Sequence, residues 1–411
     1  MEKKTLACGL FALCLFAINA PSQVTWYVDD DAVTLPLSVQ FGTIDFPFAS
    51  IAQAFVVAMD NDRVVVRPGT YSPSLTAETF GYQWGSSGNM NSHFNVEIVS
   101  SDGPEVTILD AEGSTNFIFR FRSLAAGARV RGFTFRNSQS GTGAIRLGST
   151  STSFEATDVE ITQCIFENNI YGIATFGASD LLKIHGNLFI NNNDNALWVS
   201  DLTTNPAPGG SVSGGGDIYN NTIVYGPNNG IRVQGGTWNI FNNIIAGNAN
   251  NGIFDFGLTA PANPTSVATN YNCVFGNGLD YGMGFAAGPN DVNADPMFVS
   301  PLPGPAPAPG TCIPTTLPFD YHLMPGSPCI DAAAPGLPAY LATDIDLDPR
   351  RVNLTTQSLG TAPVDIGADE VNDVQLQILS QSLSSGSLTL LTAANAGAFQ
   401  QRFASINEGN V

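Results

Sequence analysis

Gln163-Cys-Ile-Phe-Glu-Asn-Asn169 is repeated, with changes, as Gly186-Asn-Leu-Phe-Ile-Asn-Asn192 and as Asn242-Asn-Ile-Ile-Ala-Gly-Asn248. Three weaker copies extend the series: Gly132–Asn137, Asn220–Gly226 and Asn272–Asn277. The aligned positions are Phe133, Cys164, Asn187, Asn221, Asn243 and Cys273, which subtraction places 31, 23, 34, 22 and 30 residues apart. A period in this range is typical of a protein built from stacked structural repeats.

A second set of apolar segments lies between these copies, each after a glycine- or asparagine-rich turn. They are Ala144–Leu147, Gly172–Thr175, Ala196–Val199, Gly230–Val233 and Gly252–Asp255. Each repeat therefore holds at least two short strands with apolar residues at every second position. Such strands cannot bury their apolar faces alone, so the repeats must stack. Their unequal lengths argue against a propeller. We predict an all-β fold, a right-handed parallel β-helix whose turns accept insertions.

Stacking Cys164 over Asn187 and Asn221 fixes three columns of side chains. The column predicted to face inward is aliphatic: Val130, Ile161, Ile184, Ile218 and Ile240. One residue earlier, an outward column alternates in charge: Arg129, Glu160, Lys183 and Asp217. One residue later, a column becomes aromatic: Arg131, Thr162, His185, Tyr219, Phe241 and Tyr271. We also expect Asn187, Asn221 and Asn243 to form a hydrogen-bonded ladder at a bend of the coil.

The composition fits a loop-rich β protein and excludes other classes. The 411 residues include 42 glycines and 26 prolines, only 12% are charged, and the net charge is −20. Nucleic-acid binding needs clustered lysine and arginine, so we expect none. Abundant phenylalanine, isoleucine and valine argue against disorder.

The N-terminus has the pattern of an export signal. Glu2, Lys3 and Lys4 precede a short apolar run, and small residues at 20–22 suit cleavage after Ser22. The run is too short to span a bilayer, and no later segment is apolar for long enough, so we expect no transmembrane segment in the mature chain. A buried N-terminal helix is the alternative. Removal of residues 1–22 would leave Lys183 as the only lysine.

Segments at both ends of the coil region carry further patterns. The beginning has Trp26–Asp31, Asp45–Ile51 and Val64–Tyr71, and the end has Asp295–Phe298, Pro325–Asp331, Asp344–Arg351 and Val364–Glu370. Together they resemble secreted bacterial right-handed β-helix proteins of the pectin-lyase-like superfamily, and the end is similar to that of surface proteins with C-terminal anchors. The resemblance implies a single-stranded coil with a short N-terminal capping helix at 52–59. It implies no particular activity, because the superfamily includes lyases, hydrolases, epimerases and adhesins.

These observations divide the chain into four parts. They are a signal peptide at 1–22, a cap with the first strands at 23–75, the β-helix at 76–371 and a tail at 372–411. A proline-rich excursion at 300–312 belongs to the β-helix, because family-like sequence resumes after it. For the tail we expect either extra strands or the remnant of an anchoring module.

The outward positions of the second set of strands supply a candidate binding face. The candidates fall in one row: Arg146, Ala174, Trp198, Arg232 and Phe254. Cations and aromatic rings in one row suit a polysaccharide that carries acidic groups. A solvated face with incidental aromatic residues is the alternative. The register of the last segment is ambiguous, so either Phe254 or Asp255 could point outward.

Residues for catalysis are harder to assign. Lys183 could act as the general base of a lyase, but its place between two acids favours an ion-paired rung of the charged column. His185 falls in the aromatic column, where a stacked structural role is favoured over acid catalysis. His93 and His322 have no nucleophile partner, and histidines and cysteines are not spaced as zinc ligands.

Two clusters of carboxylates could hold calcium, which prefers hard oxygen ligands. They are Asp29–Asp31 and the alternating set Asp344, Asp346 and Asp348. Neither matches an EF-hand loop, and Arg350 and Arg351 favour an internal ion pair near the second set instead. Calcium is the one cofactor that these residues suggest.

The cysteines of the mature chain fall into two groups. Cys164 and Cys273 are predicted to share a column but to lie four coils apart, about 19 Å at 4.8 Å per coil, so they should be buried thiols. Cys312 and Cys329 lie in the irregular terminal region, and in an exported chain we expect a disulfide between them. Two unpaired thiols are the alternative.

The sequence thus predicts an exported or cell-surface protein, monomeric, that binds polysaccharide along a lateral face. A lyase or hydrolase activity has no residue pattern in its support. The alternative is a non-catalytic surface protein that uses the β-helix as a rigid spacer.

Overall fold

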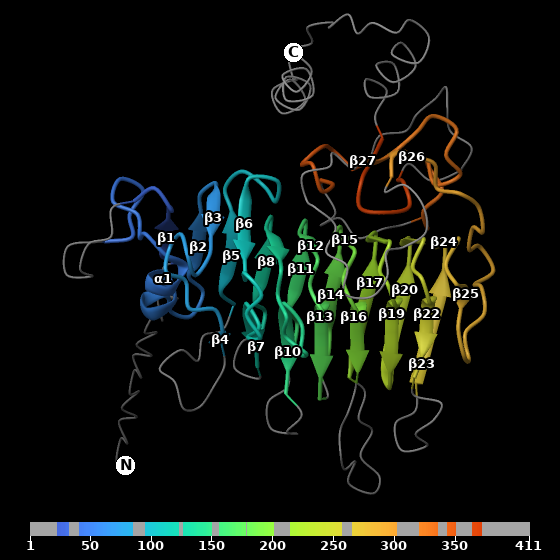
Figure 1. Cartoon of the computed structure of the whole chain (residues 1–411), viewed down its shortest axis with the longest axis horizontal. Coiled ribbons are helices and arrows are strands. Elements are labelled where there is room, and N and C mark those ends of the chain that lie inside the picture. Colours follow the sequence, from blue (N-terminus) through green and yellow to red (C-terminus); the bar gives the residue numbers. More distant parts are fainter. Residues whose placement is uncertain are drawn as a thin grey trace, which may run out of the picture.

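The computed structural model describes residues 23–32, 41–84, 95–122, 126–149, 156–177, 179–200, 214–256, 265–301, 320–335, 343–350 and 364–371. In these residues the chain winds into a right-handed parallel β-helix with three long parallel sheets (Figure 1). The predicted fold class is confirmed. The predicted signal peptide, His93, Cys312, residues 302–312 of the proline-rich excursion and the tail at 372–411 lie outside the described residues.

Each coil contributes a strand to the first, second and third sheet in turn. The first sheet contains β1 (Thr25–Val28), β2 (Arg63–Val66), β5 (Glu97–Ser100), β8 (Arg129–Arg131), β11 (Glu160–Thr162), β14 (Leu182–His185), β17 (Gly215–Tyr219), β20 (Gly236–Phe241) and β23 (Thr265–Asn270). The second sheet contains β3 (Gly69–Tyr71), β6 (Thr107–Asp110), β9 (Thr134–Arg136), β12 (Ile165–Glu167), β15 (Leu188–Ile190), β18 (Thr222–Val224), β21 (Ile244–Ala246) and β24 (Cys273–Phe275). The third sheet contains β4 (Tyr82–Trp84), β7 (Phe119–Phe121), β10 (Ile145–Gly148), β13 (Tyr171–Phe176), β16 (Asn195–Ser200), β19 (Asn229–Gln234), β22 (Asn251–Asp255) and β25 (Leu279–Tyr281).

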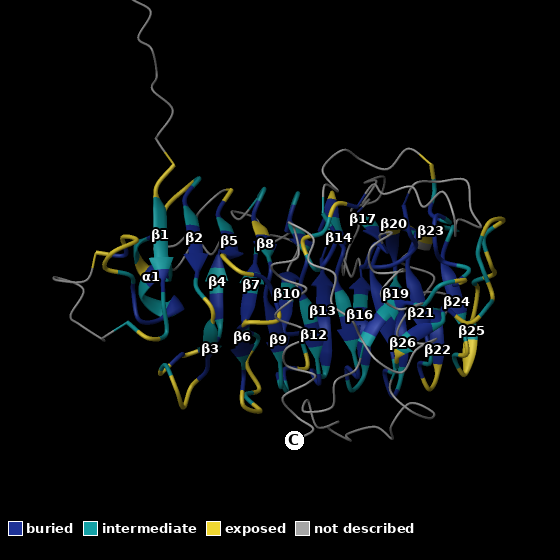
Figure 2. Cartoon of the chain, turned by 90° about the horizontal axis from the view of Figure 1, so that it is seen from above, coloured by how far each residue is buried: buried dark blue, intermediate teal, exposed yellow. Residues whose placement is uncertain are grey.

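Side chains that point inward from the sheets stack in columns and form the core. The predicted aliphatic column pairs in register from Val130 to Ile240, and its members are completely buried. In the second sheet, the rings of Phe135, Phe166 and Phe189 stack with centroids 5.0 and 4.7 Å apart. Figure 2 shows the result, with buried strands along the coil and exposed residues mainly in the turns. Because each side chain contacts its equivalents in the adjacent coils, the repeats bury one another's apolar faces.

The bend after the first sheet carries the predicted asparagine ladder. The Nδ2 atoms of Asn187 and Asn221 each donate to the Oδ1 of the next asparagine, at 3.0 Å, and the ladder ends with Asn243 donating to Asn272. A second bend repeats the device between Asn248 and Asn277. These amides satisfy the backbone groups that the strands leave unpaired at each corner, and such groups would otherwise be buried without partners.

The last coil departs from the predicted register by one residue. Phe241 pairs with Asn270, and Ile244 pairs with Cys273. Tyr271 instead takes the turn position before the ladder, with a φ of 57°, and Asn272 continues the ladder. The prediction that Cys273 lies in the column of Cys164, and Tyr271 in that of Phe241, was therefore wrong. The ladder needs an amide at this corner, which Asn272 provides and a thiol cannot.

The charged column of the first sheet has the predicted register, from Arg129 to Asp217. It also extends back by two coils to Glu97 and Arg63, whose side chains form an ion pair at 3.0 Å. The partners of Lys183 differ from the expectation. Its Nζ contacts Asp158 Oδ1 at 2.5 Å, not Glu160 or Asp217, because Glu160 is already occupied by Arg129 and by His185.

One short helix, α1 (Ile51–Val57), covers the open end of the first coil, as the family-like N-terminus implied. It buries Ile51 and Ala54. The Glu78 carboxylate accepts hydrogen bonds from the first backbone amides of α1, at 2.7 Å for Ile51, in the role that a capping side chain usually has. Within the described residues, no helix has the length and apolarity needed to cross a membrane.

The described residues after the last coil fold back over the second sheet (Figure 1). They include β27 (Asp320–Leu323), which pairs antiparallel with β26 (Phe298–Ser300). We call residues 320–335, 343–350 and 364–371 the C-terminal cap. Its apolar side chains, among them Ile330 and Ile366, pack on the outward residues of the second sheet, such as Ile244. At Gly367 a Cβ atom would lie 2.7 Å from the Ile244 side chain, so only glycine fits there.

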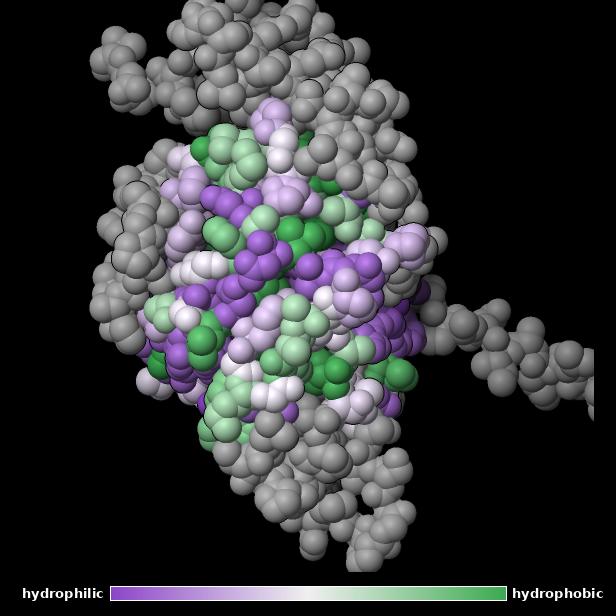
Figure 3. All heavy atoms as spheres, turned by 90° about the vertical axis from the view of Figure 1, so that its right-hand side faces the viewer, coloured by the Kyte–Doolittle hydropathy of each residue, from purple (hydrophilic) through white to green (hydrophobic). Residues whose placement is uncertain are grey.

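The last coil, which ends with β25, presents the end face of the β-helix in Figure 3. Seen end-on in Figure 3, this face mixes hydrophilic and hydrophobic residues. Leu279 and Met283 are exposed in this region. The described part of the end face therefore has no continuous apolar surface.

Candidate functional site

The outer face of the third sheet carries the predicted row of cations and aromatic rings. Strand pairing aligns it over seven coils, in the order Gln83, Arg120, Arg146, Ala174, Trp198, Arg232 and Phe254. We call these residues the cationic row. The predicted alignment is confirmed, and Arg120 and Gln83 extend it by two coils. At about 4.8 Å per coil the row is about 29 Å long.

The ambiguity at the end of the row is resolved by strand alternation. Asp255 pairs with the inward residue Val233 and is 6% exposed. Phe254, which pairs with Arg232, is half-buried at the outer face. Asp255 therefore cannot contact a ligand on this face, and its prediction as a binding residue was wrong.

Aromatic rings hold the two central arginines in place. The Arg232 guanidinium lies 4.7 Å from the ring centre of Trp198 and 4.0 Å from that of Phe256, and Arg146 lies 4.7 Å from that of Phe176. Gln234 accepts hydrogen bonds from Trp198 Nε1 at 3.3 Å and from Arg232 at 3.4 Å. The flat guanidinium groups are thus fixed by cation–π contacts.

None of the carboxylates in the described chain pairs with Arg120, Arg146 or Arg232, although the protein has 35 acids and 15 lysines and arginines. Burial lowers the pKa of Arg120 to about 10, and the charges of Arg146 and Arg122 act in the same direction. Burial also lowers the pKa of Arg146 and of Arg232. The Nε atoms of these two arginines are buried without a hydrogen-bond partner among the described residues. The row therefore concentrates positive charge that no ion pair among the described residues neutralises, although the charge of Asp194 acts on Arg232.

Sequence reasoning missed several residues of this face. Arg120 lies in Phe119-Arg-Phe121, whose alternation is the signal that could have placed it in the row. Phe176 and Gln234 are the last residues of β13 and β19, one residue beyond the predicted segments, and Phe256 follows β22 directly. Their contacts with the arginines depend on side-chain direction, which periodicity does not give.

Lys183 and His185, the residues considered for catalysis, lie on the first sheet and have structural partners. His185 is 2% exposed, stacks on Tyr219 with ring centres 4.6 Å apart, and contacts Glu160 through Nε2 at 2.9 Å. Burial lowers the pKa of His185, against the effect of Glu160. These contacts favour the structural role that we expected for both residues.

The first predicted carboxylate cluster, Asp29–Asp31, organises the beginning of the coil. Asp29 forms an ion pair with Arg67 at 2.9 Å, and Asp30 accepts a hydrogen bond from the Thr70 amide at 2.9 Å. The three carboxylates do lie within 4.8 Å of one another. Because two of them bind protein groups, the geometry gives them a structural use.

The second predicted cluster does not converge on one point. Both oxygens of Asp344 accept backbone amides, Oδ1 from Asp346 and Asp348 and Oδ2 from Glu370. Asp344 therefore shapes the turn. Asp346 instead contacts His322 through Oδ2, and Asp348 is half-buried. Arg350 is completely buried and donates to the carbonyl oxygens of Gly367 and Ala368.

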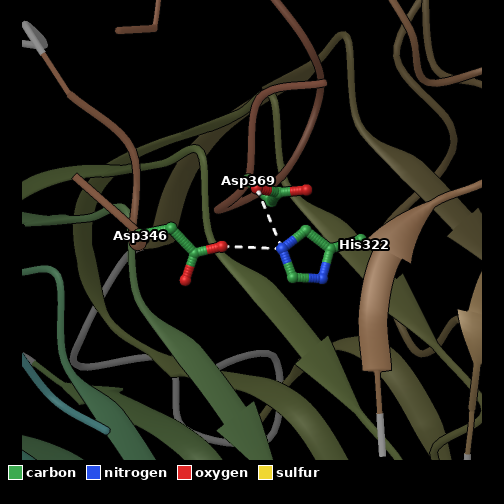
Figure 4. A group of neighbouring side chains, drawn as sticks. All are labelled: His322, Asp346 and Asp369. Carbon is green, nitrogen blue, oxygen red and sulfur yellow. Dashed lines mark hydrogen bonds and ion pairs between the residues drawn. The ribbon is translucent and has the colours of Figure 1, made fainter. Parts of the chain in front are cut away.

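His322 lies at the centre of a group that the sequence did not bring together. Its Nε2 is 2.6 Å from Asp346 Oδ2 and 3.8 Å from Asp369 Oδ1 (Figure 4). Its Nδ1 contacts the carboxylate of Asp320. Burial acts to lower the pKa of His322, but the surrounding carboxylates, Asp369 foremost, raise that pKa well above its ordinary value. The three segments that supply this group are distant in sequence, so spacing could not reveal it.

The described cysteines, Cys164, Cys273 and Cys329, are buried free thiols. This agrees with the expectation that Cys164 and Cys273 are not bonded. Cys329 is not bridged in the structure, and its predicted partner Cys312 lies outside the described residues. Cys329 has Cys273 as a neighbour in the core beneath the C-terminal cap. Burial raises the pKa of the Cys329 thiol.

A hollow of about 470 Å³ separates the last bends from the segment that leads to the C-terminal cap. Tyr225, Phe275 and Asp295 line it, together with the ladder residues Asn248 and Asn277. No sequence pattern predicts this hollow, because its walls come from turns and from a returning segment.

The comparison with family descriptions agrees with this architecture. The family description "Right handed beta helix region" matches residues 107–270. The fold is similar to the structure of pectate lyase Pel9A, with a TM-score of 0.42 and 16% identity over 86% of this chain and 98% of that one. It is also similar to the PL6 family alginate lyase AlyGC, with a TM-score of 0.36 and 13% identity over 56% of this chain and 39% of that one. A rhamnogalacturonan lyase gives a TM-score of 0.22 and 15% identity over 66% and 68% of the two chains.

No curated protein matches the chain. At these identities the structural likeness concerns the fold alone. The strand pairing of the chain itself shows a right-handed parallel β-helix, and the function has to be argued from its own residues.

Proposed function

We propose that the protein is exported and binds an anionic polysaccharide along the cationic row. The observation that supports this most directly is the set of three arginines, Arg120, Arg146 and Arg232, that face outward without a carboxylate partner in the described chain. A protein of net charge −20 that leaves such arginines unpaired on one face has a local field opposite to its overall field.

The chemistry of the row favours carboxylate groups on a long polymer. Guanidinium groups bind carboxylates in a two-point geometry and stack on rings at the same time. Trp198 lies between the cations and Phe254 follows the last of them, and both offer apolar surface for sugar rings. The regular spacing of coils presents these groups repeatedly along about 29 Å, which suits a repeating linear ligand better than a compact one.

The arginines are also oriented before any ligand arrives. Arg232 is held between two rings and Gln234, and Arg146 is held against Phe176. Side chains that are already fixed lose less conformational freedom on binding, so more of the interaction energy appears as affinity.

The test is a titration of the protein with pectate and with alginate, two linear anionic polymers, and with neutral dextran. We expect binding of at least one anionic polymer, weakened by added salt, and none of dextran. Arg146→Gln combined with Arg232→Gln should weaken binding at least about tenfold, since charge-assisted hydrogen bonds contribute about 1.5–3 kcal/mol each. Arg63→Gln combined with Arg129→Gln removes the same charge from the first sheet and should leave affinity within about twofold.

Equal loss in both double variants would mean that only the overall charge matters, and the proposed face would be wrong. Absence of binding to every polymer would favour the alternative, a rigid spacer without a ligand. Following the same mixtures for unsaturated uronate and for new reducing ends, with and without calcium, shows whether binding is accompanied by cleavage.

A further inference from the structure

Three possible ligand atoms from three separate segments of the C-terminal cap converge beside the second sheet. They are His322 Nε2 from β27, Asp346 Oδ2 from the segment 343–350 and Asp369 Oδ1 from the segment 364–371 (Figure 4). All three atoms lie within 4.8 Å of one another. The cationic row is on the third sheet, so this group has no part in the proposed function.

Asp369 is the residue that needs an explanation. It is 8% exposed, and neither of its carboxylate oxygens has a hydrogen-bond partner among the described residues. The nearest cationic group among the described residues is the His322 imidazole, whose Nε2 lies 3.8 Å away, beyond hydrogen-bond distance. A buried carboxylate without hydrogen bonds is unfavourable unless a cation approaches it.

The charge of the whole cap points in the same direction. Its described residues contain eight acids, and the only basic residues among them are Arg350 and His322. The eight are Asp320, Asp331, Asp344, Asp346, Asp348, Asp365, Asp369 and Glu370. Arg350 donates to carbonyl oxygens, and no ion pair joins it to these acids among the described residues, although its charge acts on Asp344 and Asp369. A divalent cation would balance part of this excess.

The orientation of His322 also suits a metal ion. The Asp320 carboxylate contacts Nδ1, so that Nε2 is directed at Asp346 and Asp369. A carboxylate that holds the remote nitrogen of a ligating histidine is a common outer-shell arrangement in metalloproteins.

We infer that His322, Asp346 and Asp369 form a binding site for a divalent transition metal ion of the zinc class. One imidazole nitrogen and two carboxylate oxygens are ligands that Zn²⁺ accepts. Tetrahedral ligands around Zn²⁺ lie about 3.3 Å apart, and the observed separations of 2.6 and 3.8 Å fall on either side of that value. Calcium is disfavoured, since it takes six to eight oxygen ligands. Of the predicted calcium ligands, only Asp346 belongs to this site. His322 and Asp369 are its other ligands in place of Asp344 and Asp348.

Such an ion would join three segments of the cap and hold them over the second sheet. The full-length protein, stripped of metal with a chelator and dialysed, is titrated with Zn²⁺ by calorimetry. We expect one Zn²⁺ per chain and a higher melting temperature in its presence. Co²⁺ added in place of Zn²⁺ should give visible absorption bands that Zn²⁺ then abolishes.

Three variants distinguish Zn²⁺ binding at this site from nonspecific Zn²⁺ binding to the acidic residues of the cap. His322→Gln and Asp369→Asn should each weaken Zn²⁺ binding at least about tenfold. Asp348→Asn removes a charge from the same segment as Asp346 but outside the site, and should stay within about twofold of the wild type. Far-ultraviolet circular dichroism checks that each variant keeps the β-helix.

Several results would overturn the inference. They are a wild-type protein that binds no Zn²⁺ or Co²⁺ at millimolar concentration, calcium binding that His322→Gln leaves intact without any zinc binding, or the same loss of affinity in all three variants. The wild-type titration and the Co²⁺ spectrum do not depend on the folding of any variant, so the question is decided even if one of them misfolds.

Discussion

Glu160 shows how one side chain of the charged column is fixed from two directions. Its carboxylate contacts Arg129 Nε at 2.8 Å and His185 Nε2 at 2.9 Å. Burial by itself would raise the pKa of Glu160, but the hydrogen bonds and charges of His185 and Arg129 lower it to about 2. The folded protein therefore favours the ionised carboxylate more than the unfolded chain does.

The acid limb of the stability curve should report this carboxylate. Because its folded pKa is lowered, its contribution is present above the unfolded value of 4.5 and is lost as pH falls toward 2. We expect the free energy of unfolding of Glu160→Gln, from urea titrations, to fall less than that of the wild type over this range. Burial raises the pKa of Glu167 above 4.5, so Glu167→Gln should change the slope in the opposite sense and at pH values above 4.5. Identical slopes for Glu160→Gln and the wild type would contradict the assignment.

Lys183 is expected to matter little. Its ion pair with Asp158 is partly exposed, and pairs of this kind contribute about 0–1 kcal/mol. Lys183→Met should therefore change the free energy of unfolding by less than about 1 kcal/mol, measured by urea unfolding at neutral pH. Any polysaccharide cleavage should also persist in this variant. A loss of cleavage with unchanged stability would return Lys183 to the role of general base.

For single residues, the sequence predicted side-chain positions correctly where strand periodicity determines which way a side chain points. It failed where the contacting residue comes from a turn or from a distant segment. The alternation of strands placed Arg146, Trp198 and Arg232 correctly in one row. It could not show that Asp158, from the turn before its strand, would take Lys183. It could not show that Asp369 would reach His322 either, because neither contact follows from a period.

The asparagine ladders are the element that turns a row of strands into a coil. Asn221 is completely buried; its amide donates to the carbonyl of Ile184 and to Asn243, and its Oδ1 accepts from Asn187. Each rung therefore satisfies groups on three coils at once. A buried group that loses such a partner is destabilised by about 1–3 kcal/mol.

Removal of one rung should consequently be severe. We expect Asn221→Ala to lower the free energy of unfolding by about 3 kcal/mol or more, since at least two buried groups lose their partners. Asn250, which forms an exposed hydrogen bond with Asn228, is the matched control. Asn250→Ala should change stability by less than about 0.5 kcal/mol. Equal effects in the two variants, compared by urea unfolding, would show that burial of the ladder is not what stabilises the bend.

The repeat period predicted the strands of most coils correctly but failed to place the strands of the last coil. The first five coils kept the predicted register because each corner has the same length between strand and ladder. In the last coil, Tyr271 occupies the turn, and an alignment on Cys273 slipped by one residue. Apolar alternation alone could not detect the slip, since Cys273 and Val274 fit either register.

In the whole molecule, the C-terminal cap adds a layer of apolar side chains over the outer face of the second sheet. Its residues Cys329, Ile330 and Ile366 cover outward residues of the second sheet, including Val224 and Ile244. An outward sheet face that is apolar without a cover would be a site for association. The family-like sequence of the C-terminus implied continuity with the β-helix, but it did not imply that these segments return over coils formed some 150 residues earlier in the sequence.

A charge at the centre of this layer should detach it. Ile366→Asp places a carboxylate in a completely buried position, and we expect loss of several kcal/mol of cap stability, seen as faster limited proteolysis after residue 320 and as dye binding to the uncovered sheet. Leu279→Asp makes the same change at a side chain that is 61% exposed and should leave both readings unchanged. A fully intact cap in Ile366→Asp would mean that contacts other than the apolar layer hold it in place.

The charged column of the first sheet has a consequence for how the length of this molecule can change. From Arg63 to Asp217 the sign of the charge reverses at every coil. Deletion or duplication of one coil within that stretch would set two like charges opposite each other at about 4.8 Å, which is destabilising. Deletion or duplication of two neighbouring coils restores the alternation. The alternation therefore favours changes in length by even numbers of coils. Ancestral recombination could lengthen or shorten this part of the protein by two coils more readily than by one.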